Sequence, residues 1–124
     1  MQTVNALSNR VIGLAIEVHR TIGPGLLESV YQECLCMELA EAGIPFQSQA
    51  MIPVQYKGRT VQAGFRSDIV VADAIILEIK AITALLPAHE AQILTYLRMS
   101  GIRVGFLLNF HAPKLKYGLR RFIV

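Results

Sequence analysis

The fold of this chain is decided by one segment, SDIVVADAIILEIK, at residues 67–80. Its two apolar runs are rich in β-branched side chains, and Ala72-Asp73 between them predicts the turn of a β-hairpin. Asp68 lies five residues before Asp73, and Glu78 lies five residues after it. A hairpin that turns at Asp73 therefore places the carboxylates of Asp68 and Glu78 roughly opposite each other.

The polar residues of this hairpin are typical of a site for a hard metal ion. Glu78 and Lys80 share one face of their strand because side chains alternate, while Ile79 faces the other way. Charged side chains are seldom buried in strands unless they are paired or bound to a metal. Carboxylate oxygens suit Mg²⁺ or Mn²⁺, and a neighbouring lysine can orient a water molecule or neutralise charge on a phosphate. From spacing alone, an ordinary cross-strand ion pair of Lys80 with Asp68 or Glu78 is the simpler interpretation.

Apolar periodicity, together with glycine and proline positions, predicts the elements around this hairpin. Helices are predicted at residues 5–20, 26–42 and 87–99, and strands at residues 46–56, 59–65, 67–71, 74–80 and 102–109, with an edge strand at 122–124. The order α-α-β-β-β-β-α-β, followed by that edge strand, predicts an α/β fold with a mixed central β-sheet flanked by helices. The helix at 87–99 connects two apolar strands, so we expect strands 74–80 and 102–109 to be parallel.

Length and composition indicate one globular domain over residues 1–124. Hydrophobic residues make up 53% of the chain and charged residues 17%, which excludes an intrinsically disordered protein. The longest apolar runs fall far short of the roughly 18 residues of a membrane-spanning helix, so we expect no membrane partner. The net charge of +3 permits a polyanionic partner, and basic residues gather near the C-terminus at Lys114, Lys116, Arg120 and Arg121. A merely solvated basic face explains this cluster equally well.

The two cysteines, Cys34 and Cys36, lie two positions apart in a predicted helix. Side chains at that spacing point to different faces, which argues against a disulfide between them. No second Cys/His pair accompanies them, so a zinc site is not indicated. Free thiols and an N-terminus without an export signal predict a cytoplasmic protein.

Three motifs together resemble the PD-(D/E)XK nuclease superfamily. Asp68 followed after nine residues by Glu78-Ile79-Lys80 resembles its D…(D/E)-x-K core, with Ser67 where the proline of that name would stand. Gln92 and Tyr96 resemble the Q-x-x-x-Y signature of its exonuclease branch. The string from Gly25 through Glu28 to Tyr31 is similar to the motif of the GxxExxY protein family. The resemblance covers residues 5–121 and implies a restriction-endonuclease-like core.

The resemblance also implies roles for individual residues. Glu28 would supply a third metal-binding carboxylate beside Asp68 and Glu78, and the main-chain carbonyl of Ile79 would be a further ligand. Lys80 would position the attacking water. An ordinary exposed glutamate near a helix N-terminus is the alternative interpretation of Glu28.

Several supporting residues carry two interpretations each. Gln92 and Tyr96 share a helix face and would reach the site or a nucleic-acid backbone, while Tyr31 is as well explained by packing as by substrate contact. His89, one turn before Gln92, would contact phosphate or transfer a proton, or would be a histidine near a helix N-terminus with no functional role. Arg66, two residues before Asp68 and expected on the same strand face, would neutralise a phosphate or form a plain salt bridge.

The sequence therefore predicts a metal-dependent nuclease that hydrolyses phosphodiester bonds of DNA, or less readily RNA, with Mg²⁺ or Mn²⁺. A nucleic-acid-binding or regulatory module that keeps the fold but has little turnover is the main alternative. A hydrolase of another phosphate-containing substrate is a weaker one. The high apolar fraction fits an interface, so a homodimer or a protein partner is also expected.

Overall fold

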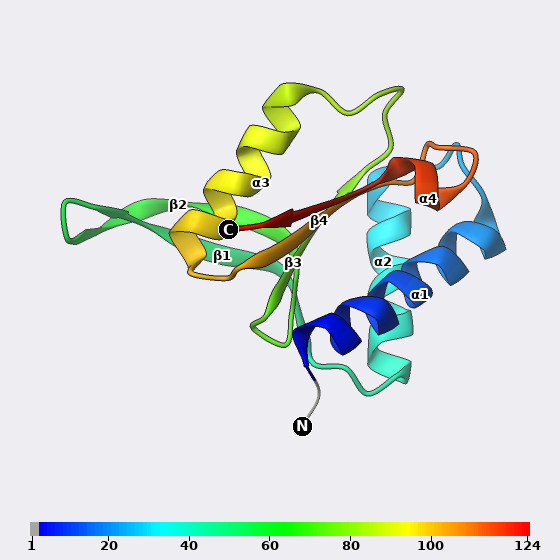
Figure 1. The fold of residues 1–124 in the computed structure, drawn as a ribbon, viewed down its shortest axis with the longest axis horizontal. Coiled ribbons are helices and arrows are strands. Elements are labelled where there is room, and N and C mark those ends of the chain that lie inside the picture. The colour runs from blue at the N-terminus through cyan, green and yellow to red at the C-terminus, as the bar shows by residue number, and fades with distance from the viewer. Residues whose placement is uncertain (1–2) are drawn as a thin grey trace.

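The computed structural model describes residues 3–124, which form one five-stranded sheet with helices on both faces (Figure 1). The strand order is β1-β2-β3-β4-β5. The elements are α1 (Val4–Ile22), α2 (Glu28–Glu41), β1 (Phe46–Tyr56), β2 (Arg59–Val71), β3 (Ile75–Lys80), α3 (Pro87–Ser100), β4 (Val104–Asn109), α4 (Leu115–Gly118) and β5 (Leu119–Ile123). The predicted α/β fold with a mixed sheet is confirmed.

The central hairpin and the crossover are formed as the sequence predicts. β2 and β3 pair antiparallel around Ala72 and Asp73, which both adopt positive φ, 51° and 53°. β3 and β4 pair in parallel, with α3 as the connection between them. One detail of the element order differs, because the two strands expected at 59–65 and 67–71 are a single strand, β2. The predicted edge strand is present as β5, and the short helix α4, which was not predicted, precedes it.

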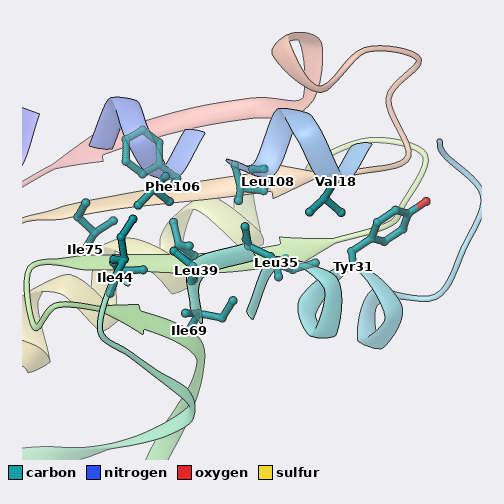
Figure 2. Packing of buried hydrophobic residues seen from close by; sticks show 14 of the residues in the cluster. Val18, Tyr31, Leu35, Leu39, Ile44, Ile69, Ile75, Phe106 and Leu108 are labelled. Atoms are coloured by element: carbon teal, nitrogen blue, oxygen red, sulfur yellow. The ribbon is translucent and has the colours of Figure 1, made fainter. Parts of the chain in front are cut away.

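The two faces of the sheet carry separate apolar cores because side chains alternate along each strand. The larger core lies between the sheet and the helices α1 and α2, where Tyr31, Leu35 and Leu39 of α2 meet strand residues such as Ile75 and Phe106 (Figure 2). The smaller core lies under α3. It contains Ala50, Ile52, Val70, Ile76, Ile93, Leu97 and Leu107. Residues at successive positions of β3 thus belong alternately to the two cores.

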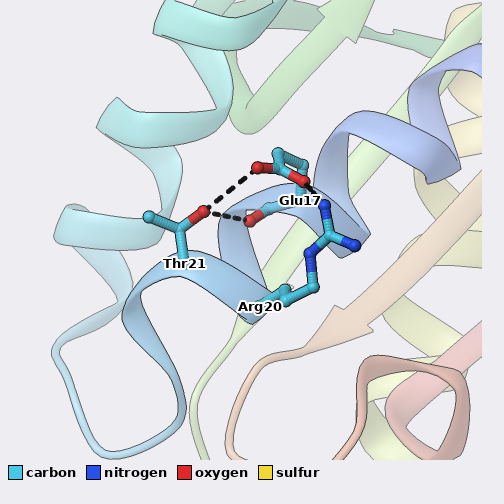
Figure 3. A network of polar contacts seen from close by, with 3 residues as sticks. All are labelled: Glu17, Arg20 and Thr21. Carbon is cyan, nitrogen blue, oxygen red and sulfur yellow. Dashed lines mark hydrogen bonds and ion pairs between the residues drawn. The ribbon is translucent and has the colours of Figure 1, made fainter.

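Both ends of α1 have clear local causes. Thr3 caps α1 by accepting a hydrogen bond from the Ala6 N–H at 3.0 Å. At the other end, Glu17 accepts from Arg20 and Thr21 (Figure 3), and Gly23 follows with φ 71°. A glycine tolerates this backbone conformation without steric cost. The second helix begins at Glu28, two residues later than the predicted boundary, and Leu27 before it is 75% exposed.

A local irregularity in the β1–β2 pair changes which residues face α3. Gln49 has φ 54° and, with Asp68 opposite it, makes no regular ladder pair. Phe65 and Ile69 are four residues apart on β2 and would share a face in a regular strand. Phe65 nevertheless packs in the core under α3, whereas Ile69 lies in the larger core. One residue of each strand, Gln49 and Asp68, is left out of the ladder while the register stays the same, and this interruption accounts for the change of face.

The same irregularity overturns the expected position of Arg66. The simple two-residue period placed Arg66 on the face of Asp68. In the structure its neighbour Phe65 faces α3, so Arg66 points to the opposite side with the exposed Met51 as its strand partner. Arg66 is exposed and none of the ion pairs found within residues 3–124 involves it. A role for Arg66 beside Asp68 is therefore not supported.

The structure also describes the two cysteines and the character of the helices. Cys34 and Cys36 are both free thiols, as expected from their spacing. Across residues 3–124, every helix is too short or too polar to cross a bilayer.

Candidate active site

Asp68 on β2 and Glu78 on β3 lie opposite each other, and each side chain hydrogen-bonds the main chain of the other strand. The Glu78 Oε2 atom accepts hydrogen bonds from the Asp68 main-chain N–H at 3.0 Å and from the Ser67 hydroxyl at 2.8 Å. The Asp68 Oδ2 atom in turn accepts from the Ile79 main-chain N–H at 2.8 Å. Each carboxylate is thus fixed by the backbone of the other strand, and the opposed placement predicted from the hairpin is confirmed.

Both carboxyl groups are held where negative charge is unfavourable. Burial and the charge of Asp68 raise the pKa of Glu78 to about 7, against hydrogen bonds from Asp68 and Ser67 that favour ionisation. Burial also raises the pKa of Asp68, and the nearby charge of Glu28 adds to that effect. Glu78 is only 4% exposed. An acid pair that resists double ionisation, with Glu78 buried and Asp68 partly buried, is an arrangement that a divalent cation would relieve.

Lys80 lies half-buried at the end of β3, two residues after Glu78 and on the same face. Its positive charge lowers the pKa of both Asp68 and Glu78, so it lies near both carboxyl groups. Yet the ion pairs found within residues 3–124 do not include one between Lys80 and either acid. The ordinary cross-strand ion pair, the simpler interpretation of the spacing, is not what the structure shows.

Glu28 lies near the pair without joining it. It is the first residue of α2, and its Oε2 atom accepts a hydrogen bond from the Ala81 main-chain N–H at 3.1 Å, directly after Lys80. In the part of the chain that the structure describes, no three His, Cys, Asp or Glu side chains converge closely enough to hold a metal ion. The three-carboxylate centre implied by the resemblance is therefore not formed in this conformation.

Two glutamines that the sequence analysis did not single out support Asp68. The Gln32 amide of α2 donates to the Asp68 main-chain carbonyl at 3.1 Å and to the Ser48 hydroxyl at 3.0 Å, and accepts from Gln49 at 3.0 Å. Gln49 occupies the irregular position of β1 opposite Asp68, and its amide also hydrogen-bonds the Asp68 carboxylate, which lowers the pKa of that group. The link joins segments distant in sequence, so no local pattern announces it.

Of the two residues of the Q-x-x-x-Y motif, Tyr96 has clear contacts in the structure. Tyr96 stacks on Phe65 with ring centroids 3.9 Å apart, and burial together with the charges of Glu78 and Asp68 raises its pKa. Its phenol is therefore close to the carboxylate pair. Gln92, one turn earlier on α3, is exposed.

Two other candidate residues have structural roles. Tyr31 is fully buried, stacks on Phe110 at 4.5 Å, and its hydroxyl donates to the Gly23 carbonyl at 2.6 Å. Of its two interpretations, packing is supported and substrate contact is not. His89 accepts a hydrogen bond from the Leu86 main-chain N–H at 2.9 Å through Nδ1, which caps the start of α3. This contact engages one ring nitrogen and favours the structural interpretation of His89.

Comparisons with known proteins agree with this arrangement. Neither the search of curated proteins nor the search of solved structures found a match. A family model described as the PD-(D/E)XK nuclease superfamily matches residues 5–122. That range contains Glu28, Asp68, Glu78, Lys80 and Tyr96, and the match does not extend to the finer assignment to GxxExxY proteins. The chain therefore belongs to the PD-(D/E)XK nuclease superfamily.

Proposed function

We propose that this protein is a metal-dependent nuclease that hydrolyses phosphodiester bonds of DNA. The observation that carries the proposal is the hydrogen-bonded pair of Asp68 and Glu78, with Glu78 buried and Lys80 on the same face of β3 as Glu78. Membership of the superfamily supports a nuclease-like function, and its nucleases are generally dependent on divalent metals.

The donor set fits a hard divalent cation. Asp68 and Glu78 would hold Mg²⁺ or Mn²⁺ through carboxylate oxygens, which such ions prefer. The Ile79 N–H points toward Asp68, and the carbonyl of a strand residue points to the same side as its N–H, so the Ile79 carbonyl is a suitable further ligand. Glu28 would join through a change in the position of its side chain, which in this structure accepts from the Ala81 N–H through Oε2. A bound cation would lower the pKa of a coordinated water and offset charge on the phosphate.

The chain's own residues would orient the reaction. Lys80 lies beside both carboxyl groups and would hold the attacking water by hydrogen bonding and offset negative charge that develops on the phosphoryl oxygens. Hydrolysis forms a bond between the water oxygen and phosphorus and breaks one P–O ester bond. The departing oxygen gains a proton, which leaves one phosphate end and one hydroxyl end. Tyr96 would help to exclude bulk water from the buried side of the pair.

A binding module with little turnover remains the second candidate function. The specific observation in its favour is the hydrogen bond between Glu28 and Ala81, which keeps the third carboxylate out of the pair. Such a protein would bind nucleic acid through the same surface without cutting it.

Cleavage of plasmid DNA and of single-stranded DNA and RNA oligonucleotides with Mg²⁺ or Mn²⁺ tests the proposal. We expect the native protein to cut DNA, and Lys80→Ala and Asp68→Asn to lose at least about a hundredfold in rate. Asp73→Asn is the matched control, because Asp73 is an exposed carboxylate in the same hairpin whose conformation asparagine also tolerates.

The variants must keep the native circular dichroism spectrum for this comparison to be valid. If folded Asp68→Asn cuts at the rate of Asp73→Asn, the assignment of the metal-binding pair is wrong. If the native protein binds DNA and never cuts it, the binding module is the better description.

A further inference from the structure

A second polar surface lies at the end of the sheet where the parallel strands β3 and β4 finish. A cleft of about 600 Å³ opens there between the loop after β3 and the segment after β4, at the same end of the molecule as α4 (Figure 1). Its lining includes Asn109, His111, Tyr117, Gly118 and Arg120. The carboxyl ends of parallel strands are where α/β sheets commonly bind ligands.

The walls of the cleft are fixed by two close contacts. The Asn109 side chain, 5% exposed, accepts from the Ile82 N–H at 3.1 Å and donates to the Ile82 carbonyl at 2.9 Å, which holds the loop after β3. Gly118 approaches β4 so closely that a Cβ there would collide with the Asn109 carbonyl oxygen. The segment that carries Tyr117 and Arg120 is therefore held against the end of β4.

The charges of the cleft favour an anion. Its lining includes the cationic Arg120 and the imidazole of His111 and contains no carboxylate. Tyr117 is 65% exposed, and the Lys116 Nζ atom lies 5.1 Å from the centroid of its ring. Exposed aromatic rings among cationic side chains are typical of surfaces that bind single-stranded nucleic acid, by stacking on bases and pairing with phosphates.

The sheet register connects the cleft to the carboxylate pair. Leu107 of β4 pairs with Glu78 on β3 and with Arg120 on β5, and Leu107 belongs to the core under α3. Residues paired across strands share a face, so Arg120 lies in the same row as Glu78, two strands and about 10 Å away. A polynucleotide at the carboxylate pair would need to extend only across β4 to reach Arg120.

We infer that this cleft binds a single-stranded nucleotide of the substrate adjacent to the cleaved bond, with its phosphate on Arg120 and His111 and its base on Tyr117. The inference rests on the proposed function for the identity of the neighbouring site. It assigns substrate preference to the β4–β5 side of the sheet, and metal binding to the β2–β3 side.

A binding assay under conditions that prevent cleavage tests the cleft separately from the metal site. Fluorescence anisotropy in EDTA measures the Kd of a labelled single-stranded oligodeoxynucleotide over a range of salt concentrations. We expect Arg120→Gln to raise Kd about tenfold and to reduce the slope of log Kd against log salt by about one unit. Tyr117→Ala should raise Kd about tenfold, whereas Tyr117→Phe should bind like the native protein, because phenylalanine retains the stacking ring.

Arg98→Gln is the matched control. It also removes one exposed arginine, but Arg98 lies in the last turn of α3 and does not line the cleft. Native Kd and salt slope in Arg120→Gln and Tyr117→Ala would overturn the inference, as would tight binding to duplex DNA only. If Arg120→Gln and Tyr117→Ala both cut DNA at the native rate, the proposed nuclease activity would hold and the role of the cleft in substrate binding would be wrong. If binding depends on Arg120 but the native protein does not cut in Mg²⁺ or Mn²⁺, the role of the cleft in binding would hold and the proposed nuclease activity would be wrong.

Discussion

At the scale of single residues, Glu78 is the group whose environment departs most from water. Its pKa is raised from 4.5 to about 7. Between these pH values, Glu78 is therefore protonated in the metal-free folded protein and ionised in the unfolded chain. The contribution of Glu78 to the free energy of unfolding is fully present below about pH 4.5. It is lost as the pH rises from there through about 7. The loss is about 3 kcal/mol, from roughly 1.4 kcal/mol per pKa unit.

Glu78→Gln should remove this pH dependence, because glutamine stays neutral and its amide oxygen can still accept from Ser67 and Asp68. At pH 8 in EDTA we expect the variant to be more stable than the native protein by up to about 3 kcal/mol, with little difference at pH 4.5. Urea denaturation at the two pH values measures this. Glu33→Gln, on the exposed side of α2, is the control. Parallel pH profiles for native and Glu78→Gln proteins would contradict the raised pKa.

At the scale of elements, the active residues are held by a contact between α2 and the irregular part of β1. Gln49 takes a positive φ, which is unfavourable for a residue with a Cβ, and the Gln32 amide secures it. Gln32 also bonds the main-chain carbonyl of Asp68. The helix therefore positions the Asp68 carboxylate indirectly, through the main chain of Asp68 and the irregular backbone at Gln49.

Gln32→Ala tests this connection. We expect it to lower the free energy of unfolding by about 1 kcal/mol, since the hydrogen bonds that it loses are partly solvated. We also expect kcat for DNA cleavage to fall about tenfold while KM stays near native, because Asp68 loses its orientation and the substrate surface is unchanged. Glu33→Ala, the next and exposed residue of α2, should alter neither quantity. A change in KM alone would show that Gln32 meets the substrate.

At the scale of the whole molecule, α1 contributes to stability alone, whereas α3 contributes both to a core and to the site. The larger core and α1 lie on one face, whereas Lys80 and Tyr96 belong to the face that carries α3. α1 contributes buried side chains such as Val11 and Ala15 but none of the proposed catalytic residues. Damage to the core at α1 should therefore cost stability without disturbing the site.

Val11→Ala and Leu97→Ala are expected to differ in this respect. Both side chains are fully buried, so we expect losses of about 2 kcal/mol and about 3 kcal/mol in the free energy of unfolding. At a temperature where both variants are folded, Val11→Ala should cut DNA at the native rate. Leu97→Ala should cut more slowly, because α3 carries Tyr96 next to the carboxylate pair. Urea denaturation and initial cleavage rates test both claims, and equal activity losses would refute the separation of the two faces.

The sequence by itself determined the parts of this protein that depend on local periodicity. The hairpin of residues 67–80 brings Asp68 opposite Glu78 because turn position and strand period fix the register of nearby residues. The parallel pairing of β3 and β4 follows from the helix between them. These predictions needed no knowledge of what packs on either face.

Tertiary structure alone decided the rest. The face of Arg66 follows from the interruption of the β1–β2 ladder at Gln49 and Asp68, and the burial of Tyr31 follows from the approach of Phe110, far away in the chain. The link from Gln32 to Asp68 and the row that joins Glu78 to Arg120 likewise connect distant segments. Such contacts form only when packing of the two cores brings these elements together, so no local pattern of residues encodes them.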